Sequence, residues 1–183
     1  MRIISGELRG RRLSAPAGEH TRPTAEKVKE ALFSIIQWDI EGRRVLDLFA
    51  GSGQLGLEAL SRGARECVFV ENDRAAAGVL RENIEHCRVQ DRARVVFGDY
   101  ESYLRRGERF DIILIDPPYA SGHRERALEL ISEFDIITTN GIIVVESETK
   151  SPQLPQETDL LVKGREYGYG RTKLTLYSRR DDQ

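Results

Sequence analysis

The chain has little of what marks a secreted, membrane-spanning or polycationic protein. Only two of its 183 residues are cysteines, Cys67 and Cys87, and without metal-ligand spacing we expect reduced, inert thiols and no metal site. No apolar run approaches the ~20 residues of a membrane helix, and the N-terminus lacks the apolar core of a signal peptide. With a formal net charge of only −2, nucleic-acid binding needs a local basic patch. We therefore expect a cytoplasmic protein with one catalytic-sized domain.

An apolar run that ends in a glycine cluster is the most informative stretch of the chain. Residues 45–49 (VLDLF) favour a strand that is buried on both faces of a parallel sheet. Gly51, Gly53 and Gly56 follow at G-x-G-x-x-G spacing, directly before a helical pattern. Such a turn lets the backbone approach a ligand and directs unpaired N–H groups toward an anion. The same spacing also arises where a strand and a helix simply pack closely, so the motif alone does not decide.

Three acids near predicted strand ends narrow the choice of ligand. Glu71 suits the ribose of a nicotinamide dinucleotide or of S-adenosylmethionine, and is also compatible with an ordinary surface glutamate. Asp47 interrupts an apolar strand, where a buried carboxylate needs a cation or donors. S-adenosylmethionine brings an ammonium and a sulfonium there, whereas a nicotinamide dinucleotide brings neither. Asp99 could accept from an adenine amino group or could form a turn after Gly98.

The segment 116–119, Asp-Pro-Pro-Tyr, suggests the chemistry. It follows a predicted strand, so in a doubly wound sheet it lies at the carboxyl edge beside the glycine turn. Pro117 and Pro118 lack N–H groups, which leaves the Asp116 carboxylate and the Pro117 carbonyl as rigid acceptors. Two such acceptors could hold both hydrogens of a base's exocyclic amine and free its lone pair for methylation, while Tyr119 offers a stacking face. The alternative is a rigid turn with a surface tyrosine.

Alternating strand and helix patterns predict an α/β fold with a doubly wound, mostly parallel sheet. A basic arm at 1–24, with a small hairpin, would precede the main domain at 25–183, whose first helix Thr24 could cap. The last two strands would form an antiparallel hairpin at the sheet edge. The expected strands are 45–49, 67–71, 94–99, 110–116, 142–146, 160–163 and 173–177, with helices at 74–87 and about 124–134.

The arm is rich in arginine. Its five arginines are opposed only by Glu7 and Glu19, which is compatible with a solvated arm or with an electrostatic arm that grips a phosphate backbone. The catalytic motifs favour the second interpretation. The arginines are Arg2, Arg9, Arg11, Arg12 and Arg22.

Taken together, the motifs carry a family resemblance. DLFAGSG followed by LGLEAL, the acid at Glu71, Gly98-Asp99 and DPPY resemble a Rossmann-like class I S-adenosylmethionine-dependent N-methyltransferase. RIISGxxRGRRL at 2–13, TRPT at 21–24 and YGxGRT at 167–172 are similar, more narrowly, to the bacterial 16S rRNA (guanine(966)-N2)-methyltransferase family, over nearly the whole chain. The resemblance implies a seven-stranded sheet, S-adenosylmethionine as cofactor, guanine N2 as target and 16S rRNA in a partly assembled 30S subunit as partner.

The resemblance also assigns residues. It implies that 116–119 form the catalytic loop, Asp116, Pro117, Pro118 and Tyr119. Gln54 stands where we expect a smaller residue, which affects the local turn packing more than the activity. The implied cofactor contacts are Asp47, Phe49, Gly51, Ser52, Gly53, Glu71, Asn72, Asp99, Tyr100 and Asp116; the expected RNA contacts are Arg2, Arg9, Arg11, Arg12, Arg22 and Arg171.

Other functions stay open at this point. N-methyltransferases of DNA adenine or cytosine, or of protein glutamine, use a similar tetrapeptide. However, a DNA enzyme usually carries a sizeable target-recognition region, and only about forty residues precede the central strand. Protein glutamine enzymes typically have Asn in place of Asp116. An NAD-dependent oxidoreductase would need an acid–base residue for hydride transfer, for which His20, His86 and His123 are weak candidates, and the intact 116–119 segment disfavours a non-catalytic rRNA-binding factor.

Overall fold

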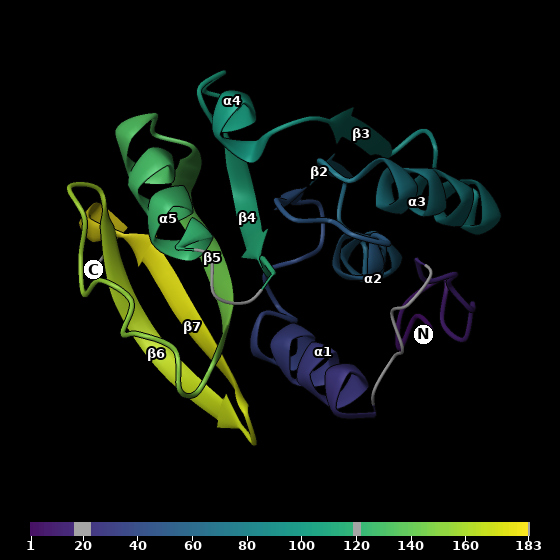
Figure 1. Cartoon of the computed structure of the whole chain (residues 1–183), viewed down its shortest axis with the longest axis horizontal. Coiled ribbons are helices and arrows are strands. Elements are labelled where there is room, and N and C mark those ends of the chain that lie inside the picture. The colour runs from purple at the N-terminus through teal and green to yellow at the C-terminus, as the bar shows by residue number, and fades with distance from the viewer. Residues whose placement is uncertain (17–22, 119–121, 183) are drawn as a thin grey trace.

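The computed structural model describes residues 1–16, 23–118 and 122–182 (Figure 1). Within these residues, seven strands form one sheet in the order β3-β2-β1-β4-β5-β7-β6. Neighbouring strands from β3 to β5 are parallel, and β7 runs antiparallel between β5 and β6. The predicted doubly wound sheet with an antiparallel C-terminal hairpin is therefore confirmed.

The elements alternate along the chain as the sequence pattern predicts. The strands are β1 Arg44–Asp47, β2 Glu66–Glu71, β3 Ala93–Phe97, β4 Phe110–Ile115, β5 Ile137–Glu148, β6 Leu161–Tyr169 and β7 Thr172–Arg179. The helices are α1 Pro23–Ile35, α2 Gln54–Ser61, α3 Arg74–Cys87, α4 Tyr100–Leu104 and α5 His123–Glu133, and a short 3-10 helix, η1, covers Arg180–Asp182. None of the described helices is long and apolar enough to cross a membrane.

Several boundaries differ from the sequence prediction. Helix α1 begins at Pro23, so Thr24 lies in its first turn and not at the N-cap position. The short helix α4 is not expected from the pattern. Strand β5 starts five residues before the predicted 142, because Ile137 pairs with Phe110 ahead of a register shift. Strands β6 and β7 likewise continue through the glycine-containing segment 164–172, since cross-strand pairing extends to Tyr169 and Thr172.

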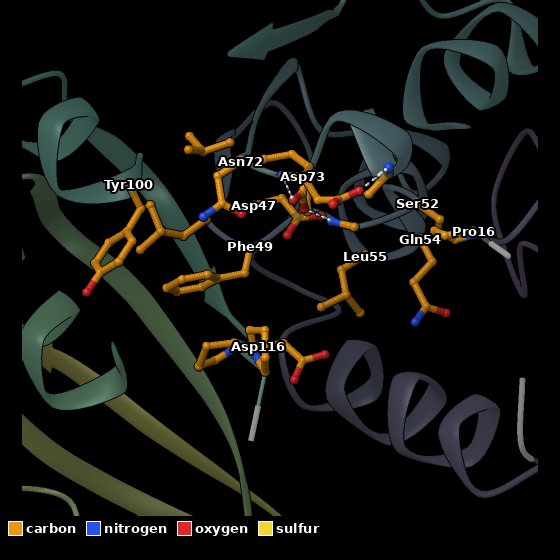
Figure 2. A pocket seen from close by; sticks show the side chains of 18 of the residues that line it. Pro16, Asp47, Phe49, Ser52, Gln54, Leu55, Asn72, Asp73, Tyr100 and Asp116 are labelled. Atoms are coloured by element: carbon orange, nitrogen blue, oxygen red, sulfur yellow. Dashed lines mark hydrogen bonds between the residues drawn. The ribbon is translucent and has the colours of Figure 1, made fainter. Parts of the chain in front are cut away.

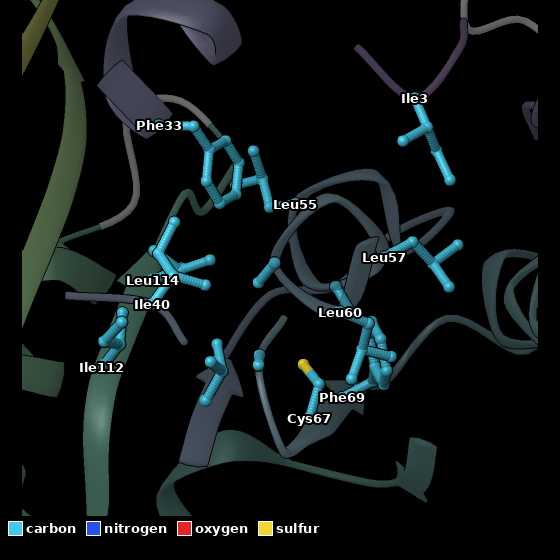
Figure 3. Close-up of a cluster of buried hydrophobic side chains, with 14 of the residues drawn as sticks. Ile3, Phe33, Ile40, Leu55, Leu57, Leu60, Cys67, Phe69, Ile112 and Leu114 are labelled. Carbon is cyan, nitrogen blue, oxygen red and sulfur yellow. The ribbon is translucent and has the colours of Figure 1, made fainter. Parts of the chain in front are cut away.

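Each face of the sheet is covered by its own set of helices. Val45, Phe69 and Leu114 face α1, α2 and α3, whereas the alternate residues Leu46 and Ile113 face α4 and α5. Val45 and Leu46 are both completely buried, which confirms that the central strand has two buried faces. Figure 3 shows the first cluster, where side chains of α1 and α2 meet the strands.

The described part of the predicted arm, residues 1–16 and called the arm from here on, packs against α2 and α3. It forms a hairpin with a single bridge, Arg2–Arg12, and it buries Ile3, Leu8 and Leu13 in the same hydrophobic cluster as the sheet. In Figure 1 the N-terminus accordingly lies beside α2 and α3. The predicted small hairpin is confirmed, but its apolar residues belong to the core.

Buried polar groups also hold the arm. The Glu58 carboxylate, which is completely buried, accepts hydrogen bonds from the backbone N–H groups of Ile4 (2.8 Å) and Ser5 (3.0 Å). Lys29 lies 3.5 Å from the same carboxylate, and Arg62 donates to it at 2.9 Å. Burial lowers the pKa of the Lys29 ammonium, and the Glu58 charge opposes that change. Glu58 therefore satisfies two backbone donors and two cations at once.

Candidate active site

A cavity of about 670 Å³ opens at the carboxyl ends of β1, β2 and β4 (Figure 2). The glycine turn after β1 and the proline corner after β4 share this cavity, as the rule for parallel sheets predicts. Ten predicted site residues line it: Asp47, Phe49, Gly51, Ser52, Glu71, Asn72, Tyr100, Asp116, Pro117 and Pro118. Gly53 and Asp99 are not among its lining residues, and the predicted Tyr119 and Arg22 lie outside the described part of the chain.

The glycines of the turn have different roles. Gly51 (φ 52°) and Gly53 (φ 82°) adopt the left-handed conformation, and a Cβ on Gly53 would lie 2.3 Å from Leu80 Cδ1. Gly56 lies within α2, where a Cβ would lie 2.2 Å from the Phe69 ring. Gly56 therefore packs closely against β2, whereas Gly51 lies in the cavity wall, where approach to a ligand stays a prediction.

Asp47 is a buried carboxylate in the cavity wall. Only 1% of its surface is exposed, and its Oδ2 accepts a hydrogen bond from the Gly56 N–H at 2.9 Å. Burial, and then the nearby charges of Asp116 and Glu71, raise the pKa of Asp47 from 3.8 to about 7. A cationic ligand in the cavity would relieve this repulsion, so the site suits a ligand with positive charge.

Glu71 bridges the turn and the start of α3. Its Oε2 accepts from the Gly51 N–H at 2.6 Å, and its Oε1 accepts from the Asp73 N–H at 2.7 Å. Asp73 in turn caps α3 by accepting from the Ala76 N–H at 2.8 Å. These bonds fix the Glu71 carboxylate at the cavity wall, and its contact with a ribose stays a prediction.

Asp116 follows β4 directly and lines the same cavity as the glycine turn. Leu114 pairs with Asp47, and its carbonyl accepts from the Leu48 N–H at 3.1 Å, so the ends of β1 and β4 are adjacent. In the view of Figure 2, Asp47 lies above Phe49 and Leu55, and Asp116 lies below them. The predicted convergence of the proline corner and the glycine turn is therefore present.

A further carboxylate, Glu146, lies beside Asp116. Ile115, the last residue of β4, pairs with Val145 of the parallel strand β5. The residues that follow them, Asp116 and Glu146, are therefore neighbours. Burial and the Asp116 charge raise the pKa of Glu146 to about 8. Our sequence prediction did not include Glu146, although an acid that ends the apolar run 142–145 was a usable signal.

Aromatic rings form another wall of the cavity. The Phe49 and Tyr100 ring centroids are 4.8 Å apart, and the Tyr100 hydroxyl lies 3.1 Å from His123 Nδ1. Burial raises the pKa of Tyr100 to about 12. Asp99 instead caps α4 by accepting from the Ser102 N–H at 2.8 Å, which holds the pKa of its carboxyl below the usual range. Its role as a cofactor contact stays a prediction.

The arm arginines, which we define as Arg9, Arg11 and Arg12, differ in their exposure. Arg9 and Arg12 are exposed, whereas Arg11 is partly buried and its Nη1 donates to the His86 carbonyl at the end of α3 (2.6 Å). Arg2 has an exposed side chain. These positions leave Arg9 and Arg12 accessible to a phosphate backbone and give Arg11 a structural contact as well.

Two further segments reach the carboxyl edge of the sheet. Arg171 is exposed in the β6–β7 turn, and because Glu148 pairs with Thr172, that turn lies where β5 ends. Pro16, at the end of the arm, lines the cavity.

Within the described residues no group of three or more His, Cys, Asp or Glu side chains is arranged to hold a metal ion.

Comparison with known proteins identifies the family. A family model described as "Conserved hypothetical protein 95" matches residues 1–178. The chain belongs to this family. Protein YlbH of Bacillus subtilis is 41% identical and covers 98% of this chain and 100% of its own length. Ribosomal RNA small subunit methyltransferase D of Escherichia coli K12 is 37% identical, covering 98% of this chain and 90% of its own.

Solved structures agree with the membership of the Conserved hypothetical protein 95 family. The protein yhhF of Escherichia coli matches with a TM-score of 0.86 at 37% identity, over 98% of this chain and 97% of that one. The 16S rRNA N2 G1207 methyltransferase of T. thermophilus, in complex with AdoMet and guanosine, matches with a TM-score of 0.70 at 25% identity, over 90% of this chain and 45% of that one. The predicted Rossmann-like class I methyltransferase fold and the predicted rRNA methyltransferase family are confirmed.

Proposed function

We propose that this chain transfers a methyl group from S-adenosylmethionine to the exocyclic N2 amine of a guanine in 16S rRNA, position 966 by family resemblance. The observation that carries the proposal is the shared cavity, which the glycine turn and residues 116–118 line together. Relatives named as small-subunit rRNA methyltransferases support the reaction class and the kind of substrate.

The cavity fits S-adenosylmethionine in size and in charge. Its volume of about 670 Å³ falls in the usual range for cofactor sites. Asp47 and Glu71 supply carboxylates for an ammonium, a sulfonium or ribose hydroxyls, and Phe49 and Tyr100 supply an apolar wall. When bound, the cofactor supplies a methyl carbon whose bond to sulfur breaks as its bond to the amine nitrogen forms.

The proline corner would prepare the amine. The lone pair of the amine nitrogen is delocalised into the base ring. The amine is therefore a poor nucleophile until its hydrogens are held out of the ring plane. The Asp116 carboxylate and the Pro117 carbonyl can accept these two hydrogens, and the adjacent Pro118 has no N–H to compete. The proton that the nitrogen loses then passes to Asp116 and on to solvent. Tyr119, predicted to stack on the extruded base, lies outside the described residues.

The RNA would approach along the arm and the carboxyl edge of the sheet. Arg9 and Arg12 are exposed on the arm, and Arg171 is exposed where β5 ends. Such arginines bind phosphates irrespective of sequence and orient the substrate over the cavity. A 16S rRNA substrate in a partly assembled 30S subunit would place the enzyme in the cytoplasm.

Identification of the modified nucleoside tests the proposal. The wild-type protein is incubated with methyl-labelled S-adenosylmethionine and 16S rRNA, both free and in 30S particles, and the RNA is digested to nucleosides. We expect the label in N2-methylguanosine at one position. Label in another nucleoside, or in DNA or protein offered in parallel, would contradict the assigned target while leaving methyltransferase activity intact.

A further inference from the structure

The side chain of Asn83, on α3, joins the arm to the glycine turn. Its Oδ1 accepts from the Ser14 N–H at 2.8 Å, and its Nδ2 donates to the Ser14 carbonyl at 3.0 Å and to the Ser52 carbonyl at 2.9 Å. Asn83 is 2% exposed and Ser52 4%. Both ends of the amide are therefore used in a position that is shielded from water, where each bond is costly to lose.

Ser14 and Ser52, the two residues to which Asn83 is bonded, belong to different segments. In the proposed function the arm binds RNA and the glycine turn binds the cofactor. Ser52 lines the cavity, and its carbonyl belongs to the peptide bond that precedes the left-handed Gly53. Ser14 belongs to the arm, and Pro16, two residues later, lines the same cavity. The Ser52 hydroxyl also donates to Met1 Sδ, 3.2 Å away. One buried amide thus fixes the end of the arm relative to the wall of the cofactor cavity.

The polar anchors of the arm on α2 lie away from the cavity. Glu58 binds the N–H groups of Ile4 and Ser5, and the Ser61 hydroxyl accepts from the Leu8 N–H at 3.0 Å. Glu58 and Ser61 lie in the second half of α2 and do not line the cavity. They hold the arm on the protein, whereas Asn83 acts where the arm meets the glycine turn.

We propose that Asn83 is a positioning residue that couples RNA binding by the arm to cofactor binding by the glycine turn. The inference rests on the proposed function, because it requires RNA on the arm and S-adenosylmethionine in the cavity. A ligand that fixes Ser52 also fixes Ser14 through the shared amide, so the second ligand loses less conformational entropy on binding. The coupling is reciprocal: cofactor tightens RNA binding by the same factor as RNA tightens cofactor binding.

A thermodynamic cycle tests the coupling. The probe is S-adenosylhomocysteine, which cannot donate a methyl group, and its Kd is measured by calorimetry with and without saturating 16S rRNA. The ratio of the two Kd values is the coupling factor, for which we expect about fivefold or more in the wild type. For Asn83→Ala we expect a ratio within about twofold of one. A general folding defect would raise both Kd values by the same factor and leave their ratio unchanged.

A pair of substitutions at Ser14 provides an independent test should Asn83→Ala fold poorly. Ser14 is exposed, and it contacts Asn83 through its backbone. Ser14→Pro removes the N–H that donates to Asn83 and leaves the Ser14 and Ser52 carbonyls available to Asn83 Nδ2, whereas the matched control Ser14→Ala keeps all three groups. We expect Ser14→Pro to lower the coupling factor and Ser14→Ala to retain it.

Two results would overturn the inference. One is a wild-type coupling factor of one although RNA binds, and the other is an unchanged factor in both Asn83→Ala and Ser14→Pro. Either result could occur while N2-methylguanosine is still formed, so failure of the coupling is distinct from failure of the proposed reaction. Absence of RNA binding by the wild type would instead overturn the RNA substrate itself.

Discussion

Replacing Asp47 by asparagine should stabilise the fold and weaken cofactor binding. Burial and the neighbouring acids raise the pKa of Asp47 from 3.8 to about 7, so the folded state binds this proton more tightly than the unfolded chain does. The stability that the proton contributes is complete below pH 3.8 and is lost as the pH rises through about 7. At pH 8 the full cost of the buried charge remains, of the order of 4 kcal/mol. Asparagine avoids that cost, and its Oδ1 can still accept from the Gly56 N–H.

Chemical denaturation of both proteins at pH 8 and pH 5 measures this effect. We expect Asp47→Asn to be more stable than the wild type by about 1–4 kcal/mol at pH 8, and by less than half of that difference at pH 5. A variant that is less stable at pH 8, or a difference that does not change with pH, would refute the reasoning about the buried charge.

Cofactor binding should show the opposite sign. A cationic ligand favours the ionised form of Asp47, so the affinity of the wild type for S-adenosylmethionine should rise about eightfold between pH 6 and pH 7.5. Asp47→Asn should bind more weakly and lose this dependence on pH. Calorimetry at the two pH values measures these affinities. A wild-type affinity that does not change with pH would show that the positive groups of the ligand do not contact this carboxylate.

Three further comparisons test the packing and the arm. Gly56→Ala should cost about 1–3 kcal/mol of stability because its Cβ meets a ring of β2, whereas Gly78→Ala, with open space in α3, should add about 0.5–1 kcal/mol; denaturation compares the two. Glu58→Ala should cost about 3–5 kcal/mol of stability, because it leaves the buried Lys29 ammonium without its carboxylate partner. Because Glu58 also holds the arm, the amide hydrogens of the arm should exchange faster in this variant, and unchanged exchange would contradict that role. Alanine at all three arm arginines should flatten the slope of log RNA affinity against log salt by about 2, and a slope no flatter than that of the control Arg65→Ala would argue against phosphate contacts.

Much of the fold follows from local sequence patterns. Helix α3 spans the predicted residues 74–87, because its apolar periodicity and its Asp73 cap are both local features. The early start of β5 and the extension of β6 and β7 depend on pairing with distant strands. The short α4 begins where Asp99 caps it, a choice between turn and ligand contact that sequence alone left open.

The candidate site was predictable where a rule connects sequence to position. Asp47 and Asp116 were expected to converge because the carboxyl ends of adjacent parallel strands share one edge. Glu58 and Asn83 carry no such signal, since their partners lie 54 and 69 residues away in sequence. The roles of these two buried helix residues become apparent only in the folded structure, where the arm packs over them.

The effect of Asp116→Ala on binding and on transfer tests the central claim most directly. Cofactor affinity is measured by calorimetry, and methyl transfer to 16S rRNA is measured in single turnover. We predict that Asp116→Ala binds S-adenosylhomocysteine within about threefold of the wild type but transfers the methyl group at least ~100-fold more slowly, because an acceptor for the amine is lost. Equal losses of affinity and transfer rate, or transfer at the wild-type rate, would contradict the role of the proline corner in catalysis.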